Sequence, residues 1–257
     1  MSRAGACMSN RATCAIIIIG DEILSGRTTD ANLPYFARRL DELGLVLRET
    51  RVIPDSIAVI ASTVNEYRAQ VDFVLTTGGI GPTHDDVTAR AVADAFGVPV
   101  ERHPEAARRL ESYYSRRGTK PNAARMRMAD MPRGATLIDN PISQAPGFQI
   151  ENVLVLAGVP EIARAMFEEI VPRFGRGTPL VTQTIVTTLP EGAFASDLAE
   201  LQSRHHRVRI GSYPIYERNR HSVHLVLRAD DSDLLSTAAK DVDSLLAQLS
   251  RSPKDRS

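Results

Sequence analysis

The chain has few cysteines and no excess of charge of either sign. Its two cysteines, Cys7 and Cys14, lie close together near the N-terminus, without the spacing of a metal site. Reduced thiols and a cytoplasmic location are therefore the expectation. Lysine and arginine together number 31, as do aspartate and glutamate, so the formal net charge is zero. This balance argues against a general surface for nucleic acids or anionic membranes.

Long hydrophobic runs are also absent. The apolar run Ala15–Ile19 is too short to span a membrane, and the polar residues 20–22 that follow it exclude the core of a signal peptide. We expect this run to be the first strand and residues 1–12 to be a flexible tail. No lysine follows the glycines of the segment 78–81, which excludes the phosphate loop of nucleoside triphosphatases. The G-x-G-x-x-G spacing of dinucleotide-binding folds is missing as well.

What is present is an alternation of apolar runs with helical patterns. We predict strands over residues 14–19, 45–53, 71–75, 136–139, 148–150 and 153–156, helices near residues 30–43, 56–71, 86–96 and 161–174, and a broken helical region over 103–128. This order predicts an α/β fold, a three-layer sandwich in which a mainly parallel sheet lies between helices. Ligands of such folds bind at the carboxyl ends of the strands.

A second, smaller domain is expected after the boundary Gly175–Pro179, where glycine and proline cluster. We assign residues 13–175 to the first domain and residues 178–250 to a small α+β domain. Its predicted strands cover residues 180–189, 208–216 and 222–228, and its helices cover 192–204 and 232–249. This part carries no glycine-rich turn and none of the marks of a catalytic site.

Three glycines and a proline follow the third predicted strand and lead into a helix. Gly78, Gly79 and Gly81 let the backbone approach a ligand closely, and the free N–H groups of a helix start attract anions. Asp85 and Asp86 lie in the same turn and repel a bare phosphate, unless a divalent cation or an N–H-rich part of the ligand faces them. The alternative is a simple helix cap, which explains Thr83 and one aspartate but not the rest.

Other loops carry weaker signals of binding. The loop after the first strand contains Gly20, Asp21 and Glu22, and Asp55 follows the second strand. Lys120 and Asn122 stand at a helix start beside a proline. The arginines around them are interpreted as a solvated helix face. The loop 140–147 forms either a binding lip or a rigid turn.

Several of these segments, taken in order, resemble one known family. They are Gly20–Gly26 with Asp30 and Asn32, Thr77–Thr83 with Asp85, Asp86 and Thr88, Asn140-Pro141, Ala145–Gly147 and Gly158–Glu161. Together they resemble the MoaB/Mog-type molybdopterin-binding domain, in the version found at the N-terminus of competence/damage-inducible protein CinA and of eukaryotic FAD synthase. The resemblance covers about residues 13–174, and the C-terminal part resembles the small domain that follows in CinA-like proteins. The lip reads Ile142-Ser143-Gln144 where many relatives have glycine and threonine.

The resemblance implies two activities. Mog-type members bind molybdopterin and some adenylate it, and the positions of Asp55 and Asp86 belong to that site. CinA and FAD synthase versions are associated with metal-dependent cleavage of the pyrophosphate of ADP-ribose or FAD. The amidohydrolase half of CinA and the nucleotidyl-transfer half of FAD synthase are not in this sequence, so we expect neither nicotinamide-nucleotide deamidation nor FAD synthesis.

These arguments define the expected site. The expected ligand-binding residues are Gly20, Asp21, Glu22, Asp30, Asn32, Asp55, Gly78, Gly79, Ile80, Gly81, Pro82, Thr83, Thr88, Lys120, Asn122, Asn140, Ala145, Pro146, Gly147, Gly158 and Pro160. Asp21, Glu22, Asp85 and Asp86 are the expected ligands of Mg²⁺ or Co²⁺, and Asp85 and Asp86 are the expected catalytic carboxylates.

Three functions remain open from the sequence. The first is a module that binds molybdopterin or another phosphorylated pterin or nucleotide without turnover. The second is a metal-dependent pyrophosphatase that releases AMP from ADP-ribose or FAD. The third is a degenerate member retained for subunit assembly. In each case we expect a homo-oligomer with no nucleic-acid or membrane partner.

Overall fold

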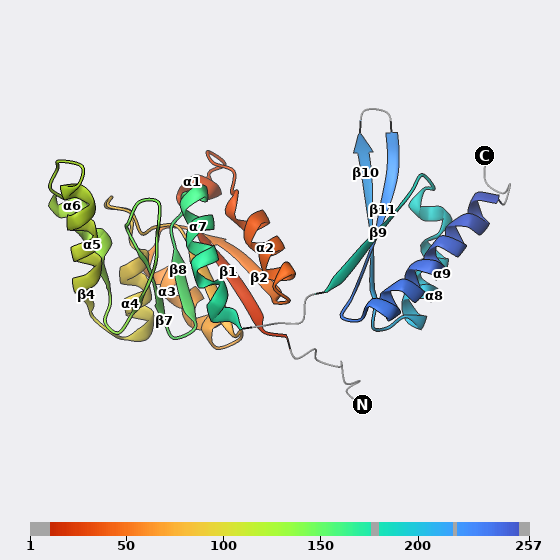
Figure 1. Cartoon of the computed structure of the whole chain (residues 1–257), viewed down its shortest axis with the longest axis horizontal. Coiled ribbons are helices and arrows are strands. Elements are labelled where there is room, and N and C mark those ends of the chain that lie inside the picture. The colour runs from red at the N-terminus through yellow and green to blue at the C-terminus, as the bar shows by residue number, and fades with distance from the viewer. Residues whose placement is uncertain (1–10, 176–179, 218–219, 252–257) are drawn as a thin grey trace. The chain divides into compact units, whose positions relative to one another are not determined.

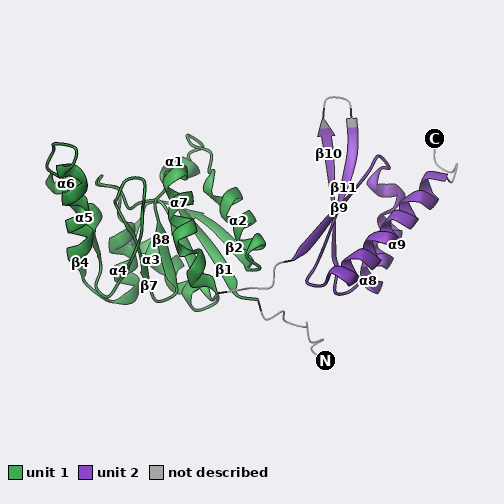
Figure 2. Ribbon diagram, in the orientation of Figure 1, with its two compact units in different colours: residues 1–177 green, residues 178–257 purple. Residues whose placement is uncertain are grey.

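The structure, a computed structural model, describes residues 11–175, 180–217 and 220–251. It divides into two compact units, residues 1–177 and 178–257, which are described separately (Figure 2). Residues 1–10 of the expected tail lie outside the described residues. Arg11, in contrast, donates hydrogen bonds to the carbonyl oxygens of Gly44 and Leu45, and Ala12 accepts one from the amide of Val46.

The first unit contains eight strands and seven α-helices among its described residues (Figure 1). The strands are β1 (Thr13–Ile19), β2 (Val46–Ile53), β3 (Phe73–Thr77), β4 (Val100–Arg102), β5 (Asp130–Pro132), β6 (Thr136–Ile138), β7 (Gly147–Ile150) and β8 (Val153–Leu156). The helices are α1 (Asp21–Leu24), α2 (Asn32–Glu42), α3 (Ile57–Arg68), α4 (Thr88–Phe96), α5 (Pro104–Ser115), α6 (Ala123–Met126) and α7 (Pro160–Ile170), with 3-10 turns at Arg127–Ala129 and Val171–Phe174.

Six of these strands form one mixed sheet in the order β2-β1-β3-β8-β7-β6. The pairs β1 with β2, β1 with β3 and β3 with β8 are parallel, whereas β7 pairs antiparallel with both β8 and β6. β4 and β5 form a separate two-stranded sheet. The central sheet is therefore mainly parallel, as the α/β prediction requires.

The strand β1 supplies side chains to both faces of the sheet. Ile17 and Ile19 pack in one core with side chains of α3, α4 and α5. Ile16 and Ile18 pack in a second core with side chains of α2 and α7. All four are at most 3% exposed, and burial of each stabilises the fold by about 1.5–3 kcal/mol. Two apolar cores on opposite faces of one sheet make the expected three-layer sandwich (Figure 1).

The parallel strands bring their carboxyl ends to one edge of the sheet. In the register, Ile19 of β1 pairs with Ile53 of β2, Ile18 with Thr77 of β3, and Thr77 with Leu156 of β8. The loops after these four strands therefore lie beside one another. The loop between the antiparallel strands β6 and β7 joins them, since Ile138 pairs with Gly147 at the same edge.

Three predicted elements differ from the structure. The third strand covers Phe73–Thr77 rather than residues 71–75, because Thr76 and Thr77 continue the ladder with β1 and β8. The helix after it begins at Thr88 rather than at Asp86, whose carboxylate is bound inside the preceding turn. Of the predicted helical region 103–128, only α5 and the short α6 are α-helical. The β4–β5 pair beside them was not predicted, because β4 is exposed throughout and β5 ends in a proline.

The second unit is a small α+β fold. It contains β9 (Val181–Thr187), β10 (Arg209–Glu217), β11 (Arg220–Ala229), α8 (Ala195–Arg204) and α9 (Ser232–Arg251), with a 3-10 turn at Glu191–Ala193. The three strands are antiparallel in the order β10-β11-β9. Alternate residues of β11, including Leu225 and Leu227, are fully buried in a core that also contains side chains of α8 and α9. In the described part of the chain, no helix has the length and apolar character needed to cross a membrane.

Candidate functional site

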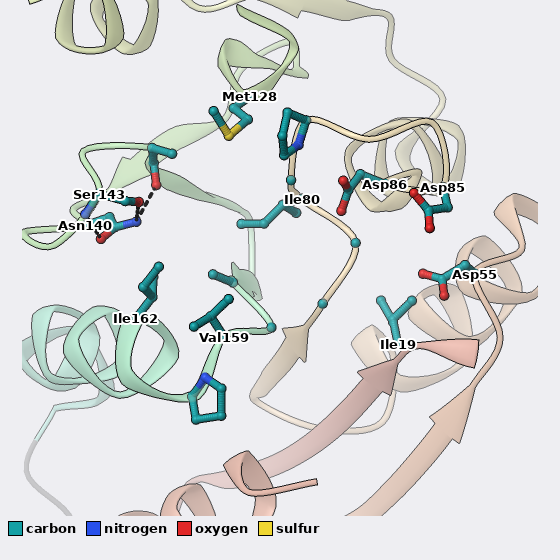
Figure 3. A pocket seen from close by; sticks show the side chains of 18 of the residues that line it. Ile19, Asp55, Ile80, Asp85, Asp86, Met128, Asn140, Ser143, Val159 and Ile162 are labelled. Atoms are coloured by element: carbon teal, nitrogen blue, oxygen red, sulfur yellow. Dashed lines mark hydrogen bonds between the residues drawn. The ribbon is translucent and has the colours of Figure 1, made fainter. Parts of the chain in front are cut away.

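A cleft of about 500 Å³ opens at the edge of the sheet where the parallel strands end (Figure 3). It is lined by Ile19, Glu22, Thr28, Asp55, Gly78, Gly79, Ile80, Gly81, Pro82, Asp85, Asp86, Met128, Asn140, Ser143, Ala145, Ala157, Gly158, Val159, Pro160 and Ile162. The volume is within the range of small-ligand sites. Five loops that are distant in sequence thus form one concave surface.

The glycine loop at the end of β3 needs glycine for steric reasons. Gly78 has φ of +108°, and a Cβ there would lie 2.1 Å from the carbonyl oxygen of Ile19. Gly79 has φ of +66°, and its Cβ would lie 2.2 Å from the hydroxyl of Thr88. Neither the dihedral angles nor the space admits a side chain. The loop therefore passes close against β1 and α4.

Hydrogen bonds attach this loop to α4. Thr88 donates its amide to the carbonyl of Gly79 at 3.0 Å and its hydroxyl to the carbonyl of Gly78 at 3.0 Å. Among the described residues, no backbone carbonyl accepts from the amides of Gly79, Ile80 or Gly81. These three N–H groups remain available to a ligand.

Asn32 was expected to bind the ligand, but the structure places it behind the loops. Its side chain is buried and donates to the hydroxyl of Thr77 at 3.0 Å and to the carbonyl of Gly158 at 2.8 Å. Thr77 in turn donates to the carbonyl of Ala157 at 2.8 Å. Asn32 therefore positions two loops of the cleft. Its own carbonyl oxygen is buried without a partner among the described residues.

Carboxylates line one side of the cleft. The Asp55 carboxylate accepts the backbone amide of Asp21 at 2.9 Å. Burial raises the pKa of the Asp55 carboxyl above its ordinary value, and repulsion from Asp21, Glu22 and Asp85 raises it further, against the Asp21 hydrogen bond. Negative charge is thus concentrated where the loops after β1, β2 and β3 meet.

Asp85 and Asp86 occupy different environments in the turn. The Asp86 carboxylate accepts both the amide and the hydroxyl of Thr83, at 2.7 and 2.5 Å. The pKa of the Asp85 carboxyl is lowered by the nearby Thr83 hydroxyl, by the backbone amide of Asp85 itself and by His84. Figure 3 shows Asp55, Asp85 and Asp86 to one side of Ile80. Asp86 therefore shapes the turn, whereas Asp85 remains an exposed, ionised carboxylate.

The expected metal ligands do not form a closed set. In the parts of the chain that the structure describes, no three carboxylate, histidine or cysteine side chains lie close enough together to hold a metal ion. Glu22, Asp85 and Asp86 line the cleft, but Asp21 does not. A cation at this edge would need oxygen atoms of the ligand to complete its coordination.

The opposite side of the cleft is a lip formed by residues 140–146. Asn140 is 5% exposed; its amide group donates to the hydroxyl of Ser143 and the carbonyl of Ala145, and its oxygen accepts the amides of Ile142 and Ser143. Gln144 has φ of +61°, a conformation that favours glycine. Asn140 thus holds the lip in one shape, and apolar side chains of Ile80, Met128, Val159 and Ile162 complete the lining.

Several expected residues lie outside the lining of the cleft. They are Gly20, Asp21, Asp30, Asn32, Thr83, Thr88, Lys120, Asn122, Pro146 and Gly147. Asp30 accepts the amide of Leu33 at the start of α2, and Asn122 accepts the amide of Arg125 at the start of α6, so both act as helix caps. Pro146 lines a smaller cavity that it shares with Arg127.

Sequence reasoning missed other lining residues. These are Ile19, Thr28, Met128, Ser143, Ala157, Val159 and Ile162. Ser143 and Val159 lie in loops whose position at the sheet edge was a usable signal. Met128 and Ile162 belong to helical segments with no local feature that marks a binding residue, so only the tertiary fold identifies them.

Both units of the chain match families of known proteins. Residues 15–176 match the family described as "Probable molybdopterin binding domain", and residues 179–254 match "FAD synthase, middle domain". A protein of Aeropyrum pernix is 36% identical over 211 residues, which cover 77% of this chain and 78% of that protein. A "Probable FAD synthase" of Caenorhabditis elegans is 30% identical over 264 residues, which cover 93% of this chain and 51% of that protein.

A solved structure shows the same fold in the first unit. It is the protein CinA from Thermoplasma acidophilum, whose function is given as unknown; it has 27% sequence identity and a TM-score of 0.60, and the match covers 65% of this chain and 99% of that one. The resemblance stated from the sequence motifs is thereby confirmed, as is the α/β fold class. The chain belongs to the molybdopterin-binding-domain family described above and continues into a unit like the middle domain of FAD synthase.

Proposed function

We propose that the chain binds a small phosphorylated ligand, a pterin or a nucleotide, in the cleft at the edge of the six-stranded sheet. The observation that carries the proposal is the glycine loop. Its residues Gly79, Ile80 and Gly81 line the cleft, and no described backbone carbonyl accepts their amides. Consecutive free N–H groups in a glycine-rich turn bind phosphate oxygens.

The remaining lining suits a flat, hydrogen-bonding ring. Ile80, Val159 and Ile162 offer an apolar surface, and Asp55 with Asp86 offers carboxylate oxygens. Carboxylates accept hydrogen bonds from the N–H groups of a pterin or an adenine. The family description and the FAD synthase relative support these two ligand classes.

Calorimetric titration tests the binding. The probes are AMP, ADP-ribose, FAD and molybdopterin, each with Mg²⁺ and with excess chelator. Asp86→Asn removes the charge but keeps an oxygen that accepts the Thr83 amide, and Asp94→Asn is the matched control because Asp94 is exposed on α4 and does not line the cleft. We expect Asp86→Asn to change the affinity and Asp94→Asn to leave it unaltered. No binding of any probe under either condition would overturn the proposal.

A second candidate function is metal-dependent hydrolysis of a nucleotide pyrophosphate. The raised pKa of Asp55, caused by burial and by three neighbouring carboxylates, favours it, because a cation would relieve that repulsion. A divalent cation, when bound, supplies charge neutralisation to the phosphates and acidifies water. Glu22 and Asp85 are the lining carboxylates that would hold it together with the phosphate oxygens, which leaves the Asp55 carboxylate free to accept a proton.

In such a hydrolysis a water oxygen bonds to one phosphorus of the pyrophosphate, the bond from that phosphorus to the bridging oxygen breaks, and the two products are AMP and the second phosphate monoester, ribose 5-phosphate or FMN. Asp55 is better suited than Asp85 to accept the proton of that water, because its pKa is raised while that of Asp85 is lowered. Chromatography of products after incubation with ADP-ribose or FAD tests this. AMP release that requires the cation and Asp55 supports hydrolysis, and binding without release supports the first function alone.

A further inference from the structure

Every charged side chain that lines the cleft is acidic. These side chains belong to Glu22, Asp55, Asp85 and Asp86. A phosphate in the cleft can therefore bond to backbone amides, but no basic side chain of the lining neutralises it. A ligand with more than one phosphate gains from basic side chains outside the cleft.

Two arginines line a second hollow beside the same lip. This hollow, the arginine hollow, has a volume of about 280 Å³ and is lined by Tyr113, Arg116, Arg117, Pro141, Ile142 and Gln144. The two cavities divide the lip between them. Residues 140, 143 and 145 line the cleft, whereas residues 141, 142 and 144 line the arginine hollow. One loop thus separates an acidic cavity from a basic one.

The arginine hollow combines a ring, an apolar surface and positive charge. The guanidinium of Arg117 lies 4.1 Å from the centre of the Tyr113 ring. Ile142 is 41% exposed and gives the hollow an apolar surface. Guanidinium groups stack on planar rings and form paired hydrogen bonds with phosphate. The chemistry fits a planar ring with a phosphate attached.

The position of the arginine hollow relative to the cleft is fixed by the lip. The side chain of Asn140 bonds to three residues of the lip, and Gln144 is held with φ of +61°. Gln144 also donates its side-chain amide to the carbonyls of Asn140 and Pro141 at 3.3 Å. The two cavities are thus held next to each other by one loop of fixed shape.

We propose that the arginine hollow is a second subsite, which binds the far half of a two-part ligand. The ligand class is the dinucleotides, in which two ring-bearing halves are joined through phosphates. One half lies in the cleft, and the other places its ring against Tyr113 and Arg117 and its phosphate against Arg116. This inference rests on the proposed function, since the first half must occupy the cleft.

Affinity measurements with a dinucleotide and its two halves test this inference. The probes are FAD, FMN and AMP, titrated by calorimetry into the full chain with Mg²⁺ and with excess chelator. The test variant is Arg116→Ala/Arg117→Ala. The control is Arg38→Ala/Arg48→Ala, which removes the same charge from two exposed residues that line neither cavity. Circular dichroism confirms that both variants are folded.

We expect the test variant to lose about tenfold in affinity for FAD and for one of its two halves, while the other half binds as before. The control should bind all three probes like the parent protein. Equal affinities of the test variant and the parent protein, or equal losses in test and control variants, would overturn the second subsite and leave the proposed function standing. Absence of binding by the parent protein would overturn both.

Discussion

The backbone amide of Asp21 donates to the carboxylate of Asp55 over 2.9 Å, so the loops after β1 and β2 are joined beside the cleft. The bond holds Asp55 among other carboxylates. Burial and repulsion from Asp21, Glu22 and Asp85 therefore raise its pKa. Repulsion among these carboxylates lowers the stability of the folded protein and concentrates negative charge at one place, a pattern common at functional sites.

Replacement of Asp55 by asparagine should stabilise the first unit at neutral pH. Because its pKa is raised on folding, the folded state binds the proton more tightly than the unfolded state. The free energy of unfolding thus falls as the pH rises from the ordinary carboxyl pKa through the raised pKa of the folded state. At pH 7 the full loss of stability caused by the ionised Asp55 is present. Asparagine keeps an acceptor for the Asp21 amide. We expect Asp55→Asn to melt about 2 °C higher than the parent protein at pH 7. At pH 3 the two proteins should melt at the same temperature.

Asp72→Asn is a control for which the expected change in melting temperature has the opposite sign. The Asp72 carboxylate accepts the amide and the hydroxyl of Thr13, both at 2.7 Å, and these bonds lower its pKa. The ionised Asp72 therefore stabilises the folded state at pH values above the ordinary carboxyl pKa, and this stabilisation is lost as the pH falls through the lowered pKa. Asp72→Asn should therefore melt lower than the parent at pH 7. A common shift in both variants would contradict the electrostatic account.

Gly79→Ala should destabilise the protein more than Gly97→Ala. Both glycines have φ near +65°, but a Cβ at Gly97 meets nothing within 4 Å, whereas one at Gly79 would lie 2.2 Å from the Thr88 hydroxyl. We expect a loss of about 1 kcal/mol for Gly97→Ala from the dihedral angle alone. The loss for Gly79→Ala should be about 3 kcal/mol or more, because the Thr88 contacts must shift. Urea unfolding measures both, and equal losses would mean that the loop is not packed against α4.

Asn140→Ala should loosen the lip. The substitution leaves the amides of Ile142 and Ser143 and the carbonyl of Ala145 without their partner. We expect a loss of about 2 kcal/mol in the free energy of unfolding. Hydrogen exchange across residues 141–145 should accelerate, while exchange in α2 stays constant. Unchanged exchange in the lip would show that Asn140 does not hold it.

Much of the fold could be predicted because its signals are local. The run Ala15–Ile19 is apolar throughout, since both faces of β1 are covered, and glycines mark the turn at Gly78–Gly81. The strands β4 and β5 escaped prediction because β4 is exposed along its whole length and β5 ends in a proline, so neither shows the apolar run of a buried strand.

The site was predictable only where its residues lie in loops at strand ends. Asp55 and Gly79 were found because each lies in the loop that follows a predicted strand. Met128 and Ile162 were not, since they reach the cleft from helical segments that the fold brings together. Asn32 and Thr88 have the right residue types at the right loops, but their side chains point to neighbouring loops and bond there. Sequence spacing cannot distinguish a residue that touches a ligand from one that supports such a residue.

Hydrogen exchange of the glycine loop tests the central claim most directly. The amides of Gly79, Ile80 and Gly81 have no described backbone partner, so they should exchange rapidly in the free protein. The protein is mixed in turn with saturating AMP, ADP-ribose, FAD or molybdopterin, with Mg²⁺ and with chelator. We predict that at least one probe slows exchange across residues 78–83 while the second unit is unaffected. Unchanged exchange of this segment with every probe would contradict the account.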